Sequence, residues 1–346
     1  MSPAITVKTP RKLIMRLDTW LSQKREQHAR GKGKTPTTVP FMSYGSTTWL
    51  RVLGRTLLLN SPYTQDAEQL LYNESLRGWR SFMSVAAANE KVKVVIEGKT
   101  IGIATSDHGG VLDATFQIEL DPGWHTIEYI TSTGNYSATR IYIVAPDKTI
   151  GIISDVDDTI INTVLPKPLV AAWNSFVLSE QARLAVPGMP VLLDHLKRAH
   201  PGMPVIYLST GAWNAAPALS RFLKRHLYPE GPLLLTDWGP TPDRWFRSGK
   251  AHKRRELRRL AHEFPHIKWL LVGDDGQHDE PIYREFALEF PDHISAVAIR
   301  RLSTGEAILA GGRSKAGMQH TVNGVPWVYG RNGAELLKEL RKLHML

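Results

Sequence analysis

Two clusters of aspartates follow short apolar runs in the second half of the chain. The first, Asp155-Val-Asp-Asp-Thr159, follows Ile152-Ile153 after the single residue Ser154, and the second lies in Gly273-Asp-Asp-Gly-Gln-His-Asp279 after Trp269–Val272. Carboxylates that leave a buried strand two residues apart can share a hard cation through their oxygens. An aspartate-rich turn without chemistry is the alternative for either cluster alone. Two acidic loops at one edge of a sheet, in a chain without cysteine, favour magnesium over a transition metal.

A hydroxyl and an amine near these acids could hold a phosphate. Ser209-Thr210-Gly211 follows the apolar run 205–208, and hydroxyls and backbone amides at a strand-to-helix turn can bind a phosphate. Such turns are common, so this motif gains meaning only beside the acids. Lys250 and Lys253 lie in the first turn of an expected helix over 250–263. One lysine that reaches the acids would offset their charge and that of a phosphate.

Alternating strands and helices are expected to position these groups. Expected strands cover 149–154, 205–208, 232–235, 269–272 and 296–299, and expected helices cover 191–200, 216–226 and 250–263. This alternation predicts a parallel α/β sheet. Because such a sheet binds its ligand beyond the carboxyl ends of the strands, both acidic clusters and the Ser209 turn are expected at one edge.

The order of these motifs resembles the haloacid-dehalogenase superfamily of phosphotransferases, whose pattern is Asp-x-Asp-x-Thr, a strand-end Ser or Thr, a Lys and Gly-Asp-x-x-x-x-Asp. The motifs are more closely similar to the actin-patch-type phosphatidate phosphatases, on Asp155-Val-Asp-Asp-Thr-Ile160, Leu208-Ser-Thr-Gly211, His252-Lys253, Phe264-Pro265, 271–279 and Ile282-Tyr283. The resemblance covers about residues 148–300, and in that family such a domain follows a β-rich region. The chain departs from the family at Asp275, where a Ser is expected, and at Glu280-Pro281, which reverses the usual Pro-Glu.

The resemblance implies catalytic roles for four residues. Asp155 would attack phosphorus and form an aspartyl-phosphate. Asp157 would protonate the leaving oxygen and then activate water. Ser209 and Lys253 would hold the phosphoryl oxygens. Lys253 is preferred over Lys250 because the His-Lys pair matches the family.

The resemblance also implies a Mg²⁺ cofactor and a supporting set. The ion would bind Asp155, the backbone carbonyl of Asp157, and Asp274. Asp279 would either assist the metal or fix the lysine. The supporting residues are Thr159, Thr210, Gly211, Asp275 and Asp279.

Two segments carry the positive charge of the chain. The 346 residues include 43 Lys+Arg and 33 Asp+Glu, a net charge of +10. Residues 1–34 carry +7 and residues 243–259 carry +6, so the remainder is slightly acidic. Such segments attract either nucleic acid or an anionic membrane surface. Composition excludes wholesale disorder, and the lack of an apolar span or signal peptide predicts a cytoplasmic protein, peripheral at most to a membrane.

Two further regions are expected before residue 148. Residues 1–36 predict a basic amphipathic helix, with an apolar stripe at Leu13, Ile14, Leu17, Trp20 and Leu21, followed by a linker at 31–36. That helix would lie on a membrane or pack on the protein itself. Residues 37–147 predict a β-sandwich-like domain of short antiparallel strands with a helical insertion over 62–80 and a binding or supporting role. The expected strands cover 49–52, 55–59, 91–96, 101–105, 114–120, 125–132 and 139–144.

These observations predict a haloacid-dehalogenase-like phosphatase domain over 148–346 that converts phosphatidate to diacylglycerol at a membrane surface. The 45 or so residues between Thr159 and 205, with a helix expected around 173–185, leave room for only a small cap. A weakly covered site suits a phosphate that a membrane or macromolecule presents. A phosphatase for nucleic-acid or protein phosphates is one alternative, although no aromatic stacking platform is evident. A protein that mainly binds anionic lipid is the other, and the sequence indicates no oligomeric state.

Overall fold

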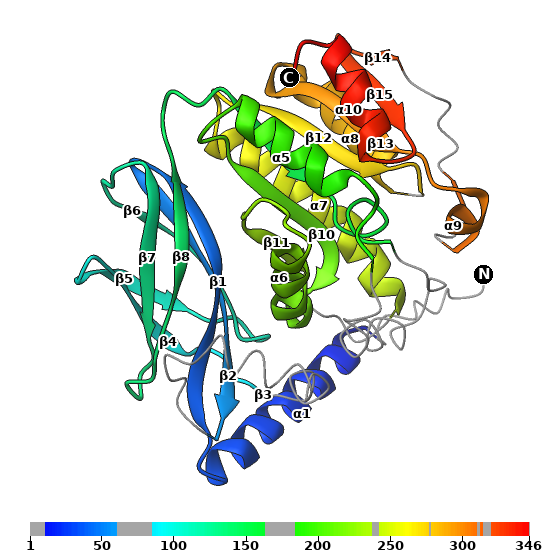
Figure 1. Cartoon of the computed structure of the whole chain (residues 1–346). Helices are drawn as coiled ribbons and strands as arrows, with labels where there is room; N and C mark the ends of the chain where they lie inside the picture. The colour runs from blue at the N-terminus through cyan, green and yellow to red at the C-terminus, as the bar shows by residue number, and fades with distance from the viewer. Residues whose placement is uncertain are drawn as a thin grey trace, which may run out of the picture.

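The computed structural model describes residues 11–60, 85–162, 184–236, 242–276, 278–309, 312–313 and 320–345. The expected helix over 62–80 lies outside these residues. The helix expected around 173–185 also lies outside them, up to residue 183. A β-rich half and an α/β half lie side by side, with helix α1 (Arg11–Gly31) along the lower side of Figure 1. The prediction of a mixed α/β chain is confirmed. No helix among the described residues is long and apolar enough to cross a membrane.

The β-rich half is one hydrogen-bonded sheet in the order β3-β2-β1-β8-β7-β4-β5, with β6 paired to β2. Its strands are β1 (Thr35–Ser46), β2 (Trp49–Leu59), β3 (Val85–Ala86), β4 (Lys91–Ile96), β5 (Lys99–Thr105), β6 (Val111–Gln117), β7 (Gly123–Ile130) and β8 (Tyr136–Val144). The sheet covers a buried apolar core. The ring of Phe116 in β6 lies against Gly102 in β5, where a Cβ would meet the ring at 2.3 Å.

Three expectations for this half are wrong. The segments 49–52 and 55–59 form one strand, and β1 extends through residues that were expected to lack a strand. The strands are not all antiparallel, because β1 and β8 pair in parallel. Along the chain, β1 is the first and β8 the last strand of this sheet, so no hairpin has to connect them. All of these strands are hydrogen-bonded into one sheet, in which β2 pairs with β1, β3 and β6.

The basic N-terminal helix leads almost directly into the sheet. Helix α1 ends at Gly31, and β1 starts at Thr35, so the expected linker over 31–36 is reduced to a turn. Ala29, at the end of α1, is buried against Leu58 and Ala87. The end of this helix is therefore part of the folded β-rich half.

The α/β half contains a seven-stranded sheet in the order β11-β10-β9-β12-β13-β15-β14. Each neighbouring pair is parallel except β14 and β15. Its strands are β9 (Ile150–Ser154), β10 (Val205–Ala212), β11 (Leu233–Thr236), β12 (Lys268–Asp274), β13 (Ile294–Arg300), β14 (Thr321–Val322) and β15 (Val325–Gly330). Its helices are α5 (Met189–Ala199), η2 (Trp213–Ala215), α6 (Ala216–Arg225), α7 (Pro242–Glu263), α8 (Asp279–Glu289), η3 (Pro291–His293), α9 (Thr304–Leu309) and α10 (Gly333–Lys342).

The central position of β9 decides where the chemistry lies. Ile152 and Ile153 are completely buried, because β9 is flanked by β10 and β12 and covered on both faces. Ser154 at the end of β9 pairs with Val272 of β12. The residues that follow these two strands therefore leave the same edge of the sheet side by side.

Candidate active site

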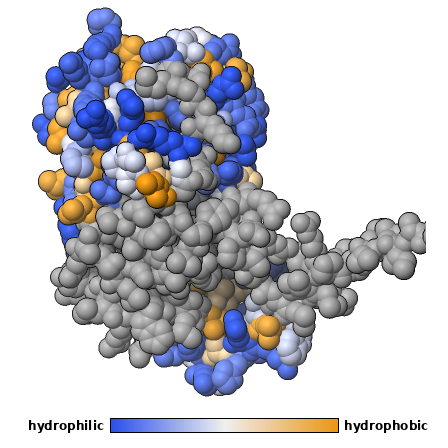
Figure 2. Space-filling model, turned by 90° about the vertical axis from the view of Figure 1, so that its right-hand side faces the viewer, coloured by the Kyte–Doolittle hydropathy of each residue, from blue (hydrophilic) through white to orange (hydrophobic). Residues whose placement is uncertain are grey.

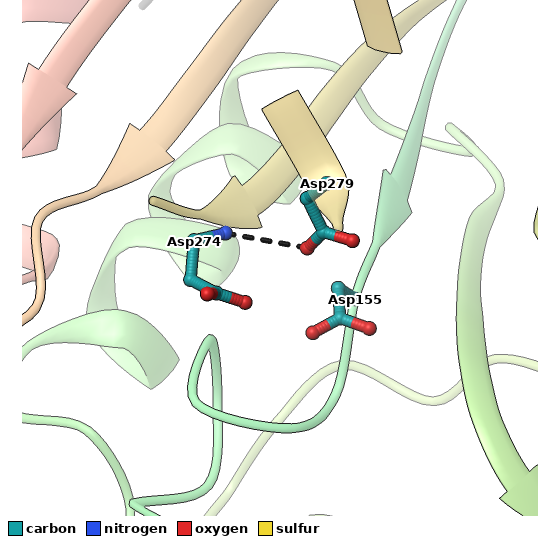
Figure 3. A group of neighbouring side chains, drawn as sticks. All are labelled: Asp155, Asp274 and Asp279. Atoms are coloured by element: carbon teal, nitrogen blue, oxygen red, sulfur yellow. Dashed lines mark hydrogen bonds between the residues drawn. The ribbon is translucent and has the colours of Figure 1, made fainter. Parts of the chain in front are cut away.

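Three buried aspartates converge beyond the ends of β9 and β12. Asp155 follows β9, Asp274 ends β12, and Asp279 opens α8. One carboxylate oxygen of each lies within 4.8 Å of the others, and all three side chains are buried. Figure 3 shows the three carboxylates gathered around a common centre. The carboxylate of Asp157 is not in this group; the resemblance assigned its backbone carbonyl, a different atom, to the metal.

Gly273 allows Asp279 to reach the end of β12. The Asp274 amide donates to Asp279 Oδ2 at 3.3 Å, shown as a dashed line in Figure 3. A Cβ at position 273 would lie 2.6 Å from that same oxygen and 2.7 Å from the Tyr283 ring. Such contacts are sterically excluded, so a glycine is required at this position.

Lys253 of α7 links two of the three acids. Its Nζ lies 2.5 Å from Asp155 Oδ1 and 2.5 Å from Asp279 Oδ1. Burial opposes the charge of Lys253, but the two carboxylates outweigh burial and raise its pKa. Burial, and next the charge of Asp279, raise the pKa of Asp155 to about 8. Within the described part of the chain, Lys250 makes no such contact with the acids.

Hydroxyl groups contact Asp155 and Asp157 of the first cluster. Thr159 Oγ1 donates to Asp155 Oδ2 at 3.1 Å and lies 3.5 Å from Asp274 Oδ2, so it braces this loop against β12. Ser209 Oγ donates to Asp157 Oδ2 at 3.0 Å. The strand-end hydroxyl that the sequence singled out therefore contacts an acid of the first cluster.

The residues after Ser209 lie within β10, which extends to Ala212, where the sequence predicted a strand-to-helix turn. The Gly211 amide donates to Ser209 Oγ at 2.9 Å. The Thr210 carbonyl accepts a hydrogen bond from Thr236 at 3.0 Å. Gly249 of α7 packs against the Thr210 side chain, which a Cβ would meet at 3.0 Å. Thr210 and Gly211 thus belong to the end of β10, beside α7.

Two residues near the acids have roles that the motifs did not reveal. Asp275 turns away from the cluster, accepts from the Leu302 amide at 2.8 Å and pairs with Arg313 at 3.3 Å. Arg300, at the end of β13, is buried and donates to the Asp158 carbonyl at 2.6 Å. Asp158 has a φ of 57°, in the left-handed region that few side chains adopt. Arg300 therefore stabilises the bend between Asp157 and Thr159. The sequence feature that could have identified Arg300 is its position directly after the predicted strand over 296–299.

The second basic segment is largely neutralised. The described arginines of α7 each pair with a carboxylate, in the pairs Arg254–Glu285, Arg255–Glu256, Arg258–Glu289 and Arg259–Glu263. The +6 of residues 243–259 therefore does not form a free cationic face over the described part of α7.

The donor set fits a hard divalent cation. Three buried carboxylates offer only oxygen, and a single lysine contacts two of them. Burial, and next the charge of Asp279, raise the pKa of Asp155, and a bound cation would favour its ionised form.

The α/β half matches a known family. Residues 150–301 match the family model described as phosphatidate phosphatase APP1, catalytic domain. The phosphatidate phosphatase APP1 of Saccharomyces cerevisiae is 27% identical over 154 residues, which are 44% of this chain and 26% of the yeast protein. An uncharacterised protein of Schizosaccharomyces pombe is 28% identical over 155 residues, 44% of this chain and 25% of that protein. The chain thus matches about a quarter of the length of these relatives.

The similarity of this chain to a solved structure is weak. A carbohydrate acetylesterase from Xanthomonas citri aligns over 89% of this chain and 74% of its own, at 9% identity and a TM-score of 0.31. A score this low supports neither a shared fold nor a shared activity.

Proposed function

Because residues 150–301 belong to the family of the phosphatidate phosphatase APP1 catalytic domain, we propose that this chain is a Mg²⁺-dependent phosphatase that converts phosphatidate to diacylglycerol. The contact of Lys253 with both Asp155 and Asp279, beside the Ser209–Asp157 hydrogen bond, carries this proposal. These contacts bring together, at one edge of the sheet, the groups that we assign as the nucleophile, the acid and two phosphate ligands. The α/β half is accordingly assigned a haloacid-dehalogenase-like fold, which the parallel strand order supports.

Asp155 attacks the phosphorus in the first step. Lys253 and Thr159 hold its two carboxylate oxygens, so the side chain is oriented before substrate arrives. A bond forms between an Asp155 oxygen and phosphorus while the bond from phosphorus to the glycerol oxygen breaks. Asp157, oriented by Ser209, gives its proton to that oxygen and diacylglycerol leaves.

Water completes the cycle in the second step. Asp157 takes a proton from water, the resulting oxygen attacks phosphorus, and the bond from phosphorus to Asp155 breaks. Phosphate leaves and both carboxyl groups return to their starting states. Lys253 holds the phosphoryl oxygens in both steps, and Ser209 does so when its hydroxyl donates to the phosphate and no longer to Asp157.

The metal would be held by Asp155, Asp274 and the backbone carbonyl of Asp157, with Asp279 beside them. When bound, Mg²⁺ would offset the negative charge of the carboxylates and of the phosphoryl oxygens.

Phosphate release from defined substrates tests this function. We expect Mg²⁺-dependent release from vesicles that contain phosphatidate, and rates at least about tenfold lower on a phosphorylated oligonucleotide, a phosphopeptide and a small phosphate ester. EDTA is expected to abolish release, and excess Mg²⁺ to restore it. Faster release from the oligonucleotide or the peptide would reassign the substrate. No release from any of them would refute the phosphatase.

We further propose that α1 brings the enzyme to an anionic membrane surface. Trp20 and Leu21 are about half exposed, and Lys24 Nζ lies 4.4 Å from the Trp20 ring. An aromatic and an aliphatic side chain beside basic residues suit the interface of a bilayer. On the face shown in Figure 2, by contrast, the apolar side chains of the described residues lie scattered among hydrophilic ones.

Charge reversal in α1 tests membrane binding without unfolding the sheet. Deletion of residues 1–34 would also remove Ala29 from its buried contact, so Lys24→Glu with Arg25→Glu is the cleaner change. We expect flotation with phosphatidate vesicles to weaken about tenfold or more, since each basic residue near the surface contributes about 1 kcal/mol. Lys338→Glu with Arg341→Glu, on the exposed face of α10, makes the same charge change elsewhere and is expected to leave flotation unchanged. Equal loss in both pairs would point to overall charge alone.

A further inference from the structure

A buried arginine of the β-rich half is bonded to the helix that carries Lys253. Arg51 of β2 is only 2% exposed. Its guanidinium donates to both carboxylate oxygens of Asp113 in β6, at 2.7 and 2.6 Å, and to Glu256 of α7 at 2.7 Å. It also donates to the Tyr44 hydroxyl at 2.8 Å. Arg51 thus joins two strands of one half to a helix of the other.

Glu256 lies three residues after Lys253, one turn along α7. Its side chain is 1% exposed, so its charge depends on the cations around it. Burial alone would raise the pKa of Glu256, but Arg51, His252 and Arg255 lower it below its usual value. A buried carboxylate whose cation is removed is strongly destabilising, unless its helix moves toward water.

Apolar contacts hold the two halves together around this ion pair. Phe41 of β1 stacks on Trp213 of η2, which directly follows β10. The two ring centroids are 4.9 Å apart, and the ring planes are inclined by 8°. Tyr44 packs against Phe264, just after α7, at 6.0 Å. These four aromatic residues belong to one continuous buried cluster. The β-rich half therefore contacts both elements that present the proposed phosphate ligands, and a buried apolar interface of this kind resists relative motion.

We propose that Arg51 is a positioning residue of the phosphatase site, because it holds α7 where Lys253 reaches Asp155. The proposal rests on the function proposed above. Lys253 itself contacts the proposed nucleophile, whereas Arg51 acts through Glu256 and the helix. A displacement of about 1 Å in a group that holds the transition state can cost about 10²-fold in rate. On this account the β-rich half supplies part of the catalytic geometry.

Chemical rescue separates positioning from a general loss of stability. We expect Arg51→Ala to lower kcat about 10- to 100-fold and to change KM by less than about threefold. Guanidinium at sub-denaturing concentration should restore kcat at least about fivefold, because the ion can occupy the space beside Glu256 and Asp113. Guanidinium destabilises folded proteins, so this gain cannot come from overall stabilisation. Sodium chloride at the same concentration is expected to restore nothing, and kcat that stays at the wild-type value in Arg51→Ala would overturn the proposal.

Two further variants keep the test decisive if Arg51→Ala does not fold. Glu256→Gln removes the charge from the helix side and keeps the side-chain shape, and we expect kcat to fall about three- to tenfold. Arg140→Gln breaks the exposed ion pair between Arg140 and Glu230, which also joins the two halves but does not involve α7. It is expected to leave kcat unchanged. An equal loss in Arg140→Gln would assign the effect to contact between the halves in general.

Hydrogen exchange distinguishes this inference from the proposed function. If the wild-type chain releases no phosphate, the proposed function is refuted. The position of α7 can still be measured, because the exchange of its backbone amides over 250–256 does not depend on activity. Arg51→Ala is expected to speed this exchange about tenfold or more, and guanidinium to slow it again. Exchange that does not respond to either change would overturn the role of Arg51 whatever the activity.

Discussion

The Asp155→Asn variant is expected to release phosphate at least about 10³-fold more slowly than the wild-type chain. An amide oxygen is a poor nucleophile toward phosphorus, and the covalent route depends on the carboxylate. Lys253 and Thr159 hold both carboxylate oxygens of Asp155, which orients this side chain before the substrate binds. Initial rates on phosphatidate vesicles, with Mg²⁺ present, measure this loss.

The loss is expected without unfolding. Burial and Asp279 raise the pKa of Asp155 to about 8, so at pH 7 ionisation of this carboxyl is disfavoured in the folded chain. A group whose pKa is raised on folding destabilises the fold above its unfolded pKa, near 4, and a neutral amide removes that cost. The melting temperature of Asp155→Asn is therefore expected to be equal to or above that of the wild type in metal-free buffer.

An isosteric change elsewhere provides the control. Asp194→Asn alters a half-exposed aspartate of α5 that pairs with Arg198, and it is expected to retain full turnover. Acid-quenched wild-type enzyme should carry phosphate on Asp155, detectable by peptide mass. Wild-type turnover in Asp155→Asn would refute the assignment of the nucleophile.

The position of the acids could be predicted because its causes are local. Asp155 and Asp274 each follow a short, mainly apolar run, and such runs become buried parallel strands when helices alternate with them. The carboxyl ends of adjacent parallel strands must meet at one edge. The choice of Lys253 came from a motif and not from periodicity, and the structure places its amine on two acids.

Strand β1 could not be predicted because its sequence resembles a loop. Pro36, Pro40 and Gly45 all lie within it, although β1 is an interior strand between β2 and β8. Proline lacks the amide that a ladder requires and is normally confined to edges and bulges. The register shift between β1 and β2 near Phe41 accommodates part of this irregularity.

The partners of charged residues were also beyond local reasoning. Arg51 stands in the apolar run 49–53, where alternation suggests a solvent-facing side chain, yet its partner Glu256 is 205 residues away. In the same way, Arg254 and Arg258 belong to the basic segment that the sequence predicted, but in the structure both arginines pair with Glu285. A local net charge counts only neighbours in the sequence, whereas ion pairs are formed in space.

Lys253→Met is the second change with a large expected effect. The variant keeps the length of the side chain and removes its charge, and we expect kcat to fall about 10²- to 10³-fold, as for the loss of one group that stabilises the transition-state charge. The free energy of unfolding should also fall by about 3–5 kcal/mol in metal-free buffer, because the carboxylate of Asp279 remains buried without its cation.

Magnesium should separate these two effects. Because the three acids then lack an internal counter-charge, Mg²⁺ is expected to raise the melting temperature of Lys253→Met more than that of the wild type, while kcat stays low. Lys250→Met, one turn earlier on α7, makes the same substitution without touching the acids and is expected to keep both activity and stability. If Lys250→Met lost activity and Lys253→Met kept it, the lysine that serves the phosphate would have to be reassigned. If both kept it, the charge on this helix would have no part in the reaction.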